Sequence, residues 1–300
     1  MYTKKRISIF EVISSAWKVE LLLLGVVAAV TALYIELLDQ YLYTSLAIVT
    51  VLGTAISFFI GFINSQAYDR WWEARKIWGE LVNDSRSFAR MTLTLFDTTG
   101  DDVHASQERI VRRHIAYLYA VRDKLRADPT LDHHPYLNEQ DTARADCANH
   151  PADMLLRIQG EDLDRAERAG VIEPIRLAQL NDMLTRFSTS MGKCERIKTT
   201  VFPAFYASLI RISIWVFIVT FPMALSEEVG YWAIPYAAVL GSIFSLTYRA
   251  GQGLIDPFEG NPADTAMSTI IRTIEINLLD QLGEPDLPPP LTPIDGKYLM

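Results

Sequence analysis

The chain has 300 residues, half of them hydrophobic, a formal net charge of −8 and an isoelectric point near 5.2. This acidic balance argues against nucleic acid as a partner, because binding to phosphates needs a basic surface. The hydrophobic residues are concentrated in two blocks, about 18–63 and 204–248, and the region between them is charged. This distribution predicts an all-α integral membrane protein with a large helical cytosolic region.

The first block predicts two membrane spans. Residues 1–17 predict a short amphipathic helix at the membrane surface, and the absence of an early apolar run argues against a removable signal peptide. Residues 21–38 form the first predicted span, and a turn without Lys or Arg follows at 38–42. The second span begins near residue 43 and continues without a proline into a charged helix that extends to about residue 90.

One face of the second span is a candidate functional surface. Thr54, Phe58 and Phe62 recur every four residues, so they share one side of the helix. The span also has many small and polar residues, which favour a packed or wet face over a lipid-facing one. The alternative is that the two phenylalanines pack against neighbouring helices or lipid.

The charged region predicts cytosolic helices. Its composition between 128 and 151 is rich in Pro, Asp, His and Asn, which predicts a loop with little regular structure. The predicted helices are the continuation of the second span, 106–127, 152–158, 162–169 and 174–197. His133 and His134 have no Cys or carboxylate four residues away, so we expect an exposed loop rather than a metal site. No motif of a known enzyme class is present, and we expect neither catalysis nor a cofactor.

The second apolar block predicts two further spans. The third, 204–225, contains Arg211 and Pro222, an acidic turn follows at 226–230, and the fourth span is 231–248. The predicted parts are therefore an amphipathic helix with two spans (1–63), a cytosolic helical region (64–203), two spans (204–250), and a cytosolic loop, helix and extended proline-rich tail (251–300). Lys and Arg flank the spans only on the side away from the two short turns. This asymmetry predicts a multi-pass protein of the cell membrane with both termini in the cytosol.

Three charged residues near the spans are candidates for pore or interface positions. Arg211 lies within a span, where an ionised group is costly, and it can contact ions, extend to the interface or pair with Glu20. Asp69 and Arg70 follow the second span directly. In an oligomer they would form charged rings, and the alternative is a salt bridge within or between subunits.

Three motifs carry a resemblance to a known family. Residues 56–62 (ISFFIGF) match the I-S-F-x-x-G-F pore segment of bestrophins, and 70–72 (RWW) follow it. Residues 256–258 (DPF) stand where that family has N-P-F-G. With the order of the apolar segments, the chain resembles the bestrophin family of ion channels over about residues 5–285, and its length is similar to that of the bacterial branch.

The resemblance implies a homopentamer in the lipid membrane that conducts small inorganic ions passively through one central pore. The second spans would line a hydrophobic neck of Thr54, Phe58 and Phe62. Phe202, before Pro203, would form a second constriction in the cytosol, and the alternative is that it packs in a core. After the DPF motif the only carboxylates of the loop are Glu259 and Asp264, so we expect conduction that does not depend on micromolar Ca²⁺.

Selectivity is the open part of this prediction. Phe58 rings turned edge-on would present positive edges to a partly dehydrated anion, which favours chloride. The net charge of −8 and Asp69 would instead enrich cations in the vestibule. A cation-selective channel of the same fold is therefore one alternative. A non-conducting, membrane-anchored helical scaffold or sensor is another, whereas a secondary transporter is disfavoured because no internal repeat is detected.

Overall fold

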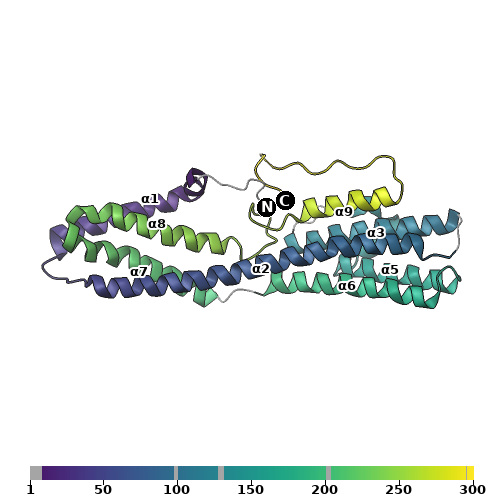
Figure 1. Ribbon diagram of the computed structural model, residues 1–300, viewed down its shortest axis with the longest axis horizontal. Coiled ribbons are helices and arrows are strands. Elements are labelled where there is room, and N and C mark those ends of the chain that lie inside the picture. Colours follow the sequence, from purple (N-terminus) through teal and green to yellow (C-terminus); the bar gives the residue numbers. More distant parts are fainter. Residues whose placement is uncertain (1–8, 98–100, 128–131, 201–203, 295) are drawn as a thin grey trace. The chain divides into compact units, whose positions relative to one another are not determined.

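The computed structural model describes residues 9–97, 101–127, 132–200, 204–294 and 296–300, and in these ranges it is helical apart from turns, loops and one isolated bridge between Ile294 and Tyr298 (Figure 1). The long helices are α1 (Ile9–Leu33), α2 (Leu46–Thr94), α3 (Asp101–Arg126), α5 (Pro151–Arg168), α6 (Pro174–Thr199), α7 (Ala204–Val229), α8 (Ala233–Gln252) and α9 (Met267–Gln281). Shorter elements are the π-helix η1 (Tyr34–Leu38), the 3₁₀ turns η2 (His134–Tyr136) and η3 (Gly230–Trp232), and α4 (Glu139–Asp146). The all-α prediction is confirmed.

The described residues form two compact units. The apolar unit contains residues 9–70 and 204–255, and the polar unit contains 71–200 and 256–300, so α2 contributes its first half to one and its second half to the other. In the apolar unit α1, α7 and α8 pack against one another (Figure 1). Their shared core includes Leu23, Val27, Phe217 and Ala237, together with Ile56 from α2.

The N-terminal helix differs from the prediction. We expected a short amphipathic helix and a separate span, but α1 runs without interruption from Ile9 to Leu33 and continues as η1 to Leu38. No proline or glycine precedes Gly25 within this helix, so nothing in the local sequence ends it. Its stretch Ala16–Leu38 is long and apolar enough to cross a membrane.

Two further helical stretches meet the same criterion, Leu46–Thr94 and Ala204–Gln252. The second of these contains both α7 and α8, which pack against each other after a reversal at Gly230, where φ is +59°. Such a backbone favours glycine, because a Cβ atom is strained there. We predicted that the third span ends at residue 225 and that an acidic turn occupies 226–230. The start of this turn is wrong, because α7 continues through Pro222 to Val229.

The polar unit has a core of its own, in which the second half of α2 meets α3, α5, α6 and α9 (Figure 1). Trp78 and Phe88 of α2 and Phe187 of α6 are fully buried there. The ring of His114 of α3 contacts that of Phe187 with centroids 4.3 Å apart and planes tilted by 37°, and it shares a hydrogen bond of 2.9 Å with the hydroxyl of Ser85. Burial lowers the pKa of His114 to about 3, so the imidazole is neutral at physiological pH.

Two predictions within the polar unit are wrong. The segment predicted as a loop contains α4, which begins where the side chain of Asn138 accepts a hydrogen bond of 2.7 Å from the backbone N–H of Asp141. The two helices predicted at 152–158 and 162–169 are one helix, α5. Gly160 costs about 1 kcal/mol in a helix, and burial of the flanking Ile158 and Leu163 offsets this cost.

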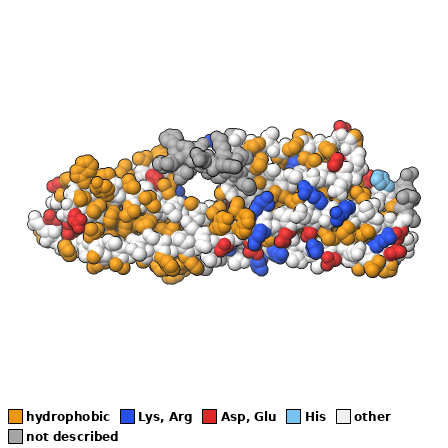
Figure 2. All heavy atoms as spheres, in the orientation of Figure 1, with side chains coloured by type: hydrophobic (Ala, Val, Ile, Leu, Met, Phe, Trp, Pro, Cys, Tyr) orange, Lys and Arg blue, Asp and Glu red, His pale blue; other side chains and the backbone are white. Residues whose placement is uncertain are grey.

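The two units differ in surface chemistry. Most of the exposed large hydrophobic side chains belong to the apolar unit, where Figure 2 shows them over much of the visible face. Of the Lys and Arg side chains visible in this view, most lie on the polar unit. An exposed apolar surface of this extent is typical of contact with lipid or with other subunits.

Candidate functional site: the outward face of helix α2

Helix α2 has two distinct faces in the apolar unit. Ile56, Ile60 and Ile63 are at most 3% exposed and pack inside the unit, at the spacing of one helical stripe. Phe58 and Phe62 are 72% and 49% exposed, and Thr54 is also exposed, so these residues project away from the core of their own unit. The candidate pore face is therefore free to meet a lumen, lipid or a second chain.

The phenylalanines of this region differ in their contacts. Phe59 and Phe62 both make edge-on contacts with Tyr206 of α7, at centroid distances of 6.2 and 6.3 Å. Phe58 contacts Phe59 at 6.0 Å and is the most exposed of the three. Phe59 therefore packs partly within the unit, and Phe58 is the ring that least supports the fold.

Small residues hold α2 close to α7 and α8. A Cβ atom added to Gly53 would lie 2.9 Å from the ring of Phe217, and one added to Gly251 would lie 1.8 Å from Oδ1 of Asn64. Asn64 also donates a hydrogen bond of 3.0 Å from Nδ2 to the carbonyl oxygen of Thr247. Such close approaches are typical of helix packing in membranes, where small residues let backbones come together.

The two charged residues after the span have different environments. Arg70 donates from Nε to the carbonyl oxygen of Ile255 at 2.9 Å, which ties the end of the span to the turn after α8 within the apolar unit. Asp69 is exposed and forms no ion pair with any described residue of the same chain. The intrachain salt bridge considered for Asp69 is therefore not formed among these residues.

Arg211 has no ion pair within the described part of the chain either, and it lies with Arg249 at an otherwise mostly apolar cleft of about 400 Å³. Its suggested partner Glu20 keeps both carboxylate oxygens buried without a hydrogen bond to any described residue. The Glu20 pairing is thus not formed, and ion contact or extension to the interface remain the predictions for Arg211. Phe202 lies outside the described residues.

The DPF loop belongs to the polar unit. Phe258 is fully buried in its core, and Trp71 donates from Nε1 to the carbonyl oxygen of Ala263 at 2.9 Å. Asp256 accepts from the backbone N–H of Phe258 at 3.0 Å and from Nζ of Lys198 at 2.5 Å. Asp264 accepts from the backbone N–H groups of residues 260 and 261, and burial raises the pKa of its carboxyl group. The other carboxylate oxygen of Asp264, Oδ1, is buried without a hydrogen-bond partner among the described residues. Conduction that does not depend on micromolar Ca²⁺ therefore stays a prediction, based on the small number of carboxylates in this loop.

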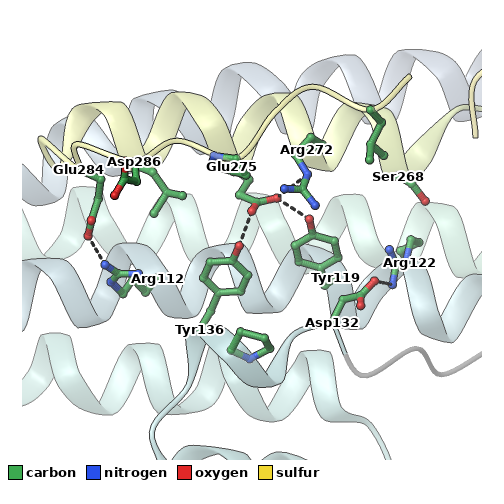
Figure 3. A pocket seen from close by; sticks show the side chains of 14 residues that line it. Arg112, Tyr119, Arg122, Asp132, Tyr136, Ser268, Arg272, Glu275, Glu284 and Asp286 are labelled. Carbon is green, nitrogen blue, oxygen red and sulfur yellow. Dashed lines mark hydrogen bonds and ion pairs between the residues drawn. The ribbon is translucent and has the colours of Figure 1, made fainter. Parts of the chain in front are cut away.

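A polar pocket of about 600 Å³ between α3, α9 and the C-terminal tail was missed by sequence reasoning (Figure 3). At its centre the buried carboxylate of Glu275 accepts hydrogen bonds from the hydroxyl groups of Tyr119 and Tyr136, and Arg272 lies 3.3 Å away. Burial and these bonds to Glu275 raise the pKa of both tyrosines. The sequence did contain a signal, because Glu275 interrupts an apolar helical stripe on α9.

A second buried polar group was also missed. Arg113 of α3 pairs with Asp141 of α4 and Asp162 of α5, each at 2.6 Å, and the side chains of Arg113 and Asp162 are only 2% exposed. Gln159 accepts a further hydrogen bond of 3.2 Å from the guanidinium. This network fastens the short helix α4, which has little apolar surface of its own, to the body of the polar unit.

Comparison with known proteins agrees with these features. The family model described as Bacterial/Fungal Bestrophin protein matches residues 6–280. The chain belongs to the bestrophin family. Its apolar helices and this membership make it a membrane protein.

Bestrophin relatives match over most of the chain. The voltage-dependent anion channel-forming protein YneE of Escherichia coli K12 is 34% identical over 253 residues, which cover 83% of this chain and 81% of that protein. A voltage-dependent anion channel-forming protein of Mesorhizobium japonicum is 32% identical over 250 residues, or 83% and 78% of the two chains. The crystal structure of a bacterial bestrophin homologue from Klebsiella pneumoniae superposes with a TM-score of 0.83 at 26% identity, covering 89% of this chain and 98% of that one.

Proposed function

We propose that this bestrophin forms an anion channel in the cell membrane, and that it conducts small ions such as chloride passively. The observation that carries the proposal is the division of α2 into a buried isoleucine face and an outward face with Phe58 and Phe62. Relatives that match more than four fifths of the chain are named as anion channel-forming proteins, which supports the choice of anions.

The proposed assembly is a homopentamer around one central pore, with four crossings per subunit. Helices α1, the first half of α2, α7 and α8 would be the crossings, since α7 and α8 have 26 and 20 residues and each is long enough to traverse about 30 Å of hydrocarbon. The lack of Lys and Arg in the turns around residues 38–42 and 226–230 supports an orientation with both termini and the polar unit in the cytosol.

Thr54, Phe58 and Phe62 are the proposed neck of the pore. An apolar constriction resists wetting, so a small change in its radius decides whether water and ions enter. Phe202 is proposed as a second, cytosolic constriction on the basis of the family resemblance. Asp69, Arg70 and Arg211 are proposed as pore or interface charges.

Anion selectivity would arise at the neck. The positive edges of Phe58 rings act on a partly dehydrated ion, whereas charges in a wide vestibule are screened within about 8 Å at physiological salt. Cation selectivity is the second candidate, favoured by the net charge of −8 and by the exposed carboxylate of Asp69, which pairs with no cation among the described residues. Both candidates share the pore and differ only in the ion that passes the neck.

Recording from the purified protein in planar bilayers under a NaCl gradient tests the proposal. A tenfold gradient places the chloride and sodium equilibrium potentials at about 59 mV with opposite signs. We expect reversal near the chloride potential. Reversal near the sodium potential would establish the cation alternative. Absence of any conductance, with a monomer or dimer in detergent by native mass measurement, would instead favour the membrane-anchored scaffold or sensor.

Variants at adjacent phenylalanines test the neck. Phe58→Ala removes the most exposed phenylalanine ring of α2, so conductance or open probability should rise while the assembly stays intact. Phe59→Ala is the matched control, because Phe59 is the same residue type about 100° round the helix and packs on Tyr206. Equal changes in conductance at both positions would refute the pore face. Phe58→Ile keeps an apolar neck without ring edges, and an unchanged reversal potential in this variant would refute the edge mechanism.

A further inference from the structure

Three side chains able to ligate a metal ion meet in the polar unit, where sequence spacing predicts an exposed loop and no metal site. His133 and His134 lie at the start of η2, and Asp146 is the last residue of α4. Nε2 of His134 lies 3.0 Å and Nε2 of His133 lies 3.8 Å from the same oxygen, Oδ1 of Asp146. One ligand atom from each of the three residues falls within 4.8 Å of the others. The fold therefore supplies the carboxylate that the local sequence lacks.

His133 distinguishes this cluster from an ordinary surface pair. His133 is only 4% exposed, and neither ring nitrogen makes a hydrogen bond to a described residue, because the carboxylate oxygens of Asp123 and Asp146 that flank the ring are each 3.8 Å away. A buried polar group without a partner is costly, and such groups in native proteins are almost always satisfied by a protein group, water or an ion. The Nε2 atom of His133 lies 3.8 Å from Oδ1 of Asp146, so an ion bound between them would satisfy this nitrogen.

The surroundings of the cluster hold the two histidines in place. The turn that carries them is anchored on both sides, by an ion pair of 2.9 Å between Asp132 and Arg122 and by the hydrogen bond from Tyr136 to Glu275 (Figure 3). On the other side, α4 is fastened through the buried Arg113 network. Ligands fixed by the scaffold lose little conformational freedom when they bind a metal.

Asp123 of α3 is placed as an outer-sphere partner. Its Oδ2 lies 3.8 Å from Nδ1 of His133, on the opposite side of the ring from the Nε2 atom that faces Asp146. Histidines that bind metals commonly direct their second nitrogen to a carboxylate, which fixes the tautomer and orients the ring. At His133, the carboxylate of Asp123 thus lies on one side of the imidazole ring and the proposed metal position on the other.

The geometry and the donor types indicate the class of metal. Tetrahedral coordination with bonds of about 2.0–2.1 Å places neighbouring ligand atoms about 3.4 Å apart. The observed 3.0 and 3.8 Å lie on either side of this value. Two imidazoles with one carboxylate suit Zn²⁺ and similar transition-metal ions, whereas Ca²⁺ and Mg²⁺ require mostly oxygen ligands.

We propose that His133, His134 and Asp146 form a binding site for one divalent transition-metal ion of the Zn²⁺ class, with a fourth position for water. The ion would link the turn after α3 to the end of α4. The site belongs to the polar unit and the proposed pore face to the apolar unit, so a test of metal binding does not depend on whether the protein conducts ions.

Zinc binding to the full-length protein in detergent tests the site. The protein carries an affinity tag without histidine, is stripped with a chelator and is desalted before ZnCl₂ is added. We expect one Zn²⁺ per chain for the wild type, and an affinity at least about tenfold weaker for His133→Asn and Asp146→Asn. His150→Gln is the matched control, because His150 pairs with a single carboxylate, that of Glu195 at 2.5 Å, and is not part of a metal-ligand cluster in the described part of the chain.

Two results would overturn the proposal. One is a wild type that binds less than a fifth of an equivalent of Zn²⁺, and the other is a pair of ligand variants that bind as tightly as His150→Gln. Because a variant of buried His133 can fail to fold, Co²⁺ is also bound to the wild type. Intense visible absorption of tetrahedral Co²⁺ with nitrogen and oxygen ligands supports the site, and the weak spectrum of octahedral Co²⁺ refutes it.

Discussion

Replacement of Arg113 by methionine should loosen the polar unit more than any exposed ion-pair change. The guanidinium lies between two carboxylates, with Nη2 2.6 Å from Asp141 and Nη1 2.6 Å from Asp162. Asp162 keeps Arg109 and Arg165 as partners after the substitution, whereas the carboxylate of Asp141, 9% exposed, keeps only Asn138 among the described residues. The cost therefore falls mainly on Asp141 and on the helix α4 that carries it.

Removing one partner of a buried ion pair costs about 3–5 kcal/mol, which is a large fraction of the 5–15 kcal/mol that stabilises a typical domain. Arg144→Met is the matched control, since Arg144 also joins α4 to α5 through Glu161 at 2.8 Å but with side chains 33% and 39% exposed. Exposed pairs contribute at most about 1 kcal/mol. Both substitutions remove one positive charge from the same region, so the difference between their losses of stability measures the effect of burial.

Amide hydrogen exchange of the full-length protein in detergent measures the effect locally. A loss of 3–5 kcal/mol should accelerate exchange of the α4 amides by about 10²–10⁴-fold in Arg113→Met, against less than about tenfold in Arg144→Met. Adding Asp141→Asn should restore part of the protection, because an amide is less costly to bury than an unpaired carboxylate. Equal exchange rates in the two single variants, or no rescue in the double variant, would refute the reasoning.

Three other predictions follow from the structure. Burial lowers the pKa of His114 to about 3, so the neutral ring contributes its full stability above about pH 6.5. Between pH 6.5 and pH 3 the free energy of unfolding should decline by up to about 1.4 kcal/mol per pH unit. The free energy of unfolding in urea should therefore fall less on acidification for His114→Phe than for the wild type. Gly251→Ala should reduce the fraction of protein that elutes as an assembled oligomer, because its Cβ would lie 1.8 Å from Asn64, whereas Gly25→Ala meets nothing within 4 Å and should be tolerated; equal elution profiles would contradict this. Bilayer conductance should be the same in chelator and in micromolar Ca²⁺, since Glu259 and Asp264 are the only carboxylates that follow the DPF motif in this loop and Ca²⁺ needs roughly six to eight oxygen ligands; steep activation by Ca²⁺ would disprove this.

Much of the fold could be predicted because its information is local. Long apolar stretches predict membrane helices from composition alone, and the motifs at 56–62, 70–72 and 256–258 indicated the family that the comparison then showed. Helical periodicity likewise placed both ends of α3 and α6 to within five residues. The shared face of Thr54, Phe58 and Phe62 follows from the period of the helix, and no partner is needed to deduce it.

Tertiary structure decided the features that depend on residues distant in the chain. Helix α4 has no apolar stripe to reveal it, and it is held by Asn138 at its start and by Arg113 from another helix. The histidine pair lacks a ligand at helical spacing, but α4 brings Asp146 to within 3.0 Å of His134. Local sequence sets the propensity of each segment, whereas burial and ion pairing are properties of the packed chain. The candidate metal site and the buried arginine network could therefore be found only once the helices were placed together.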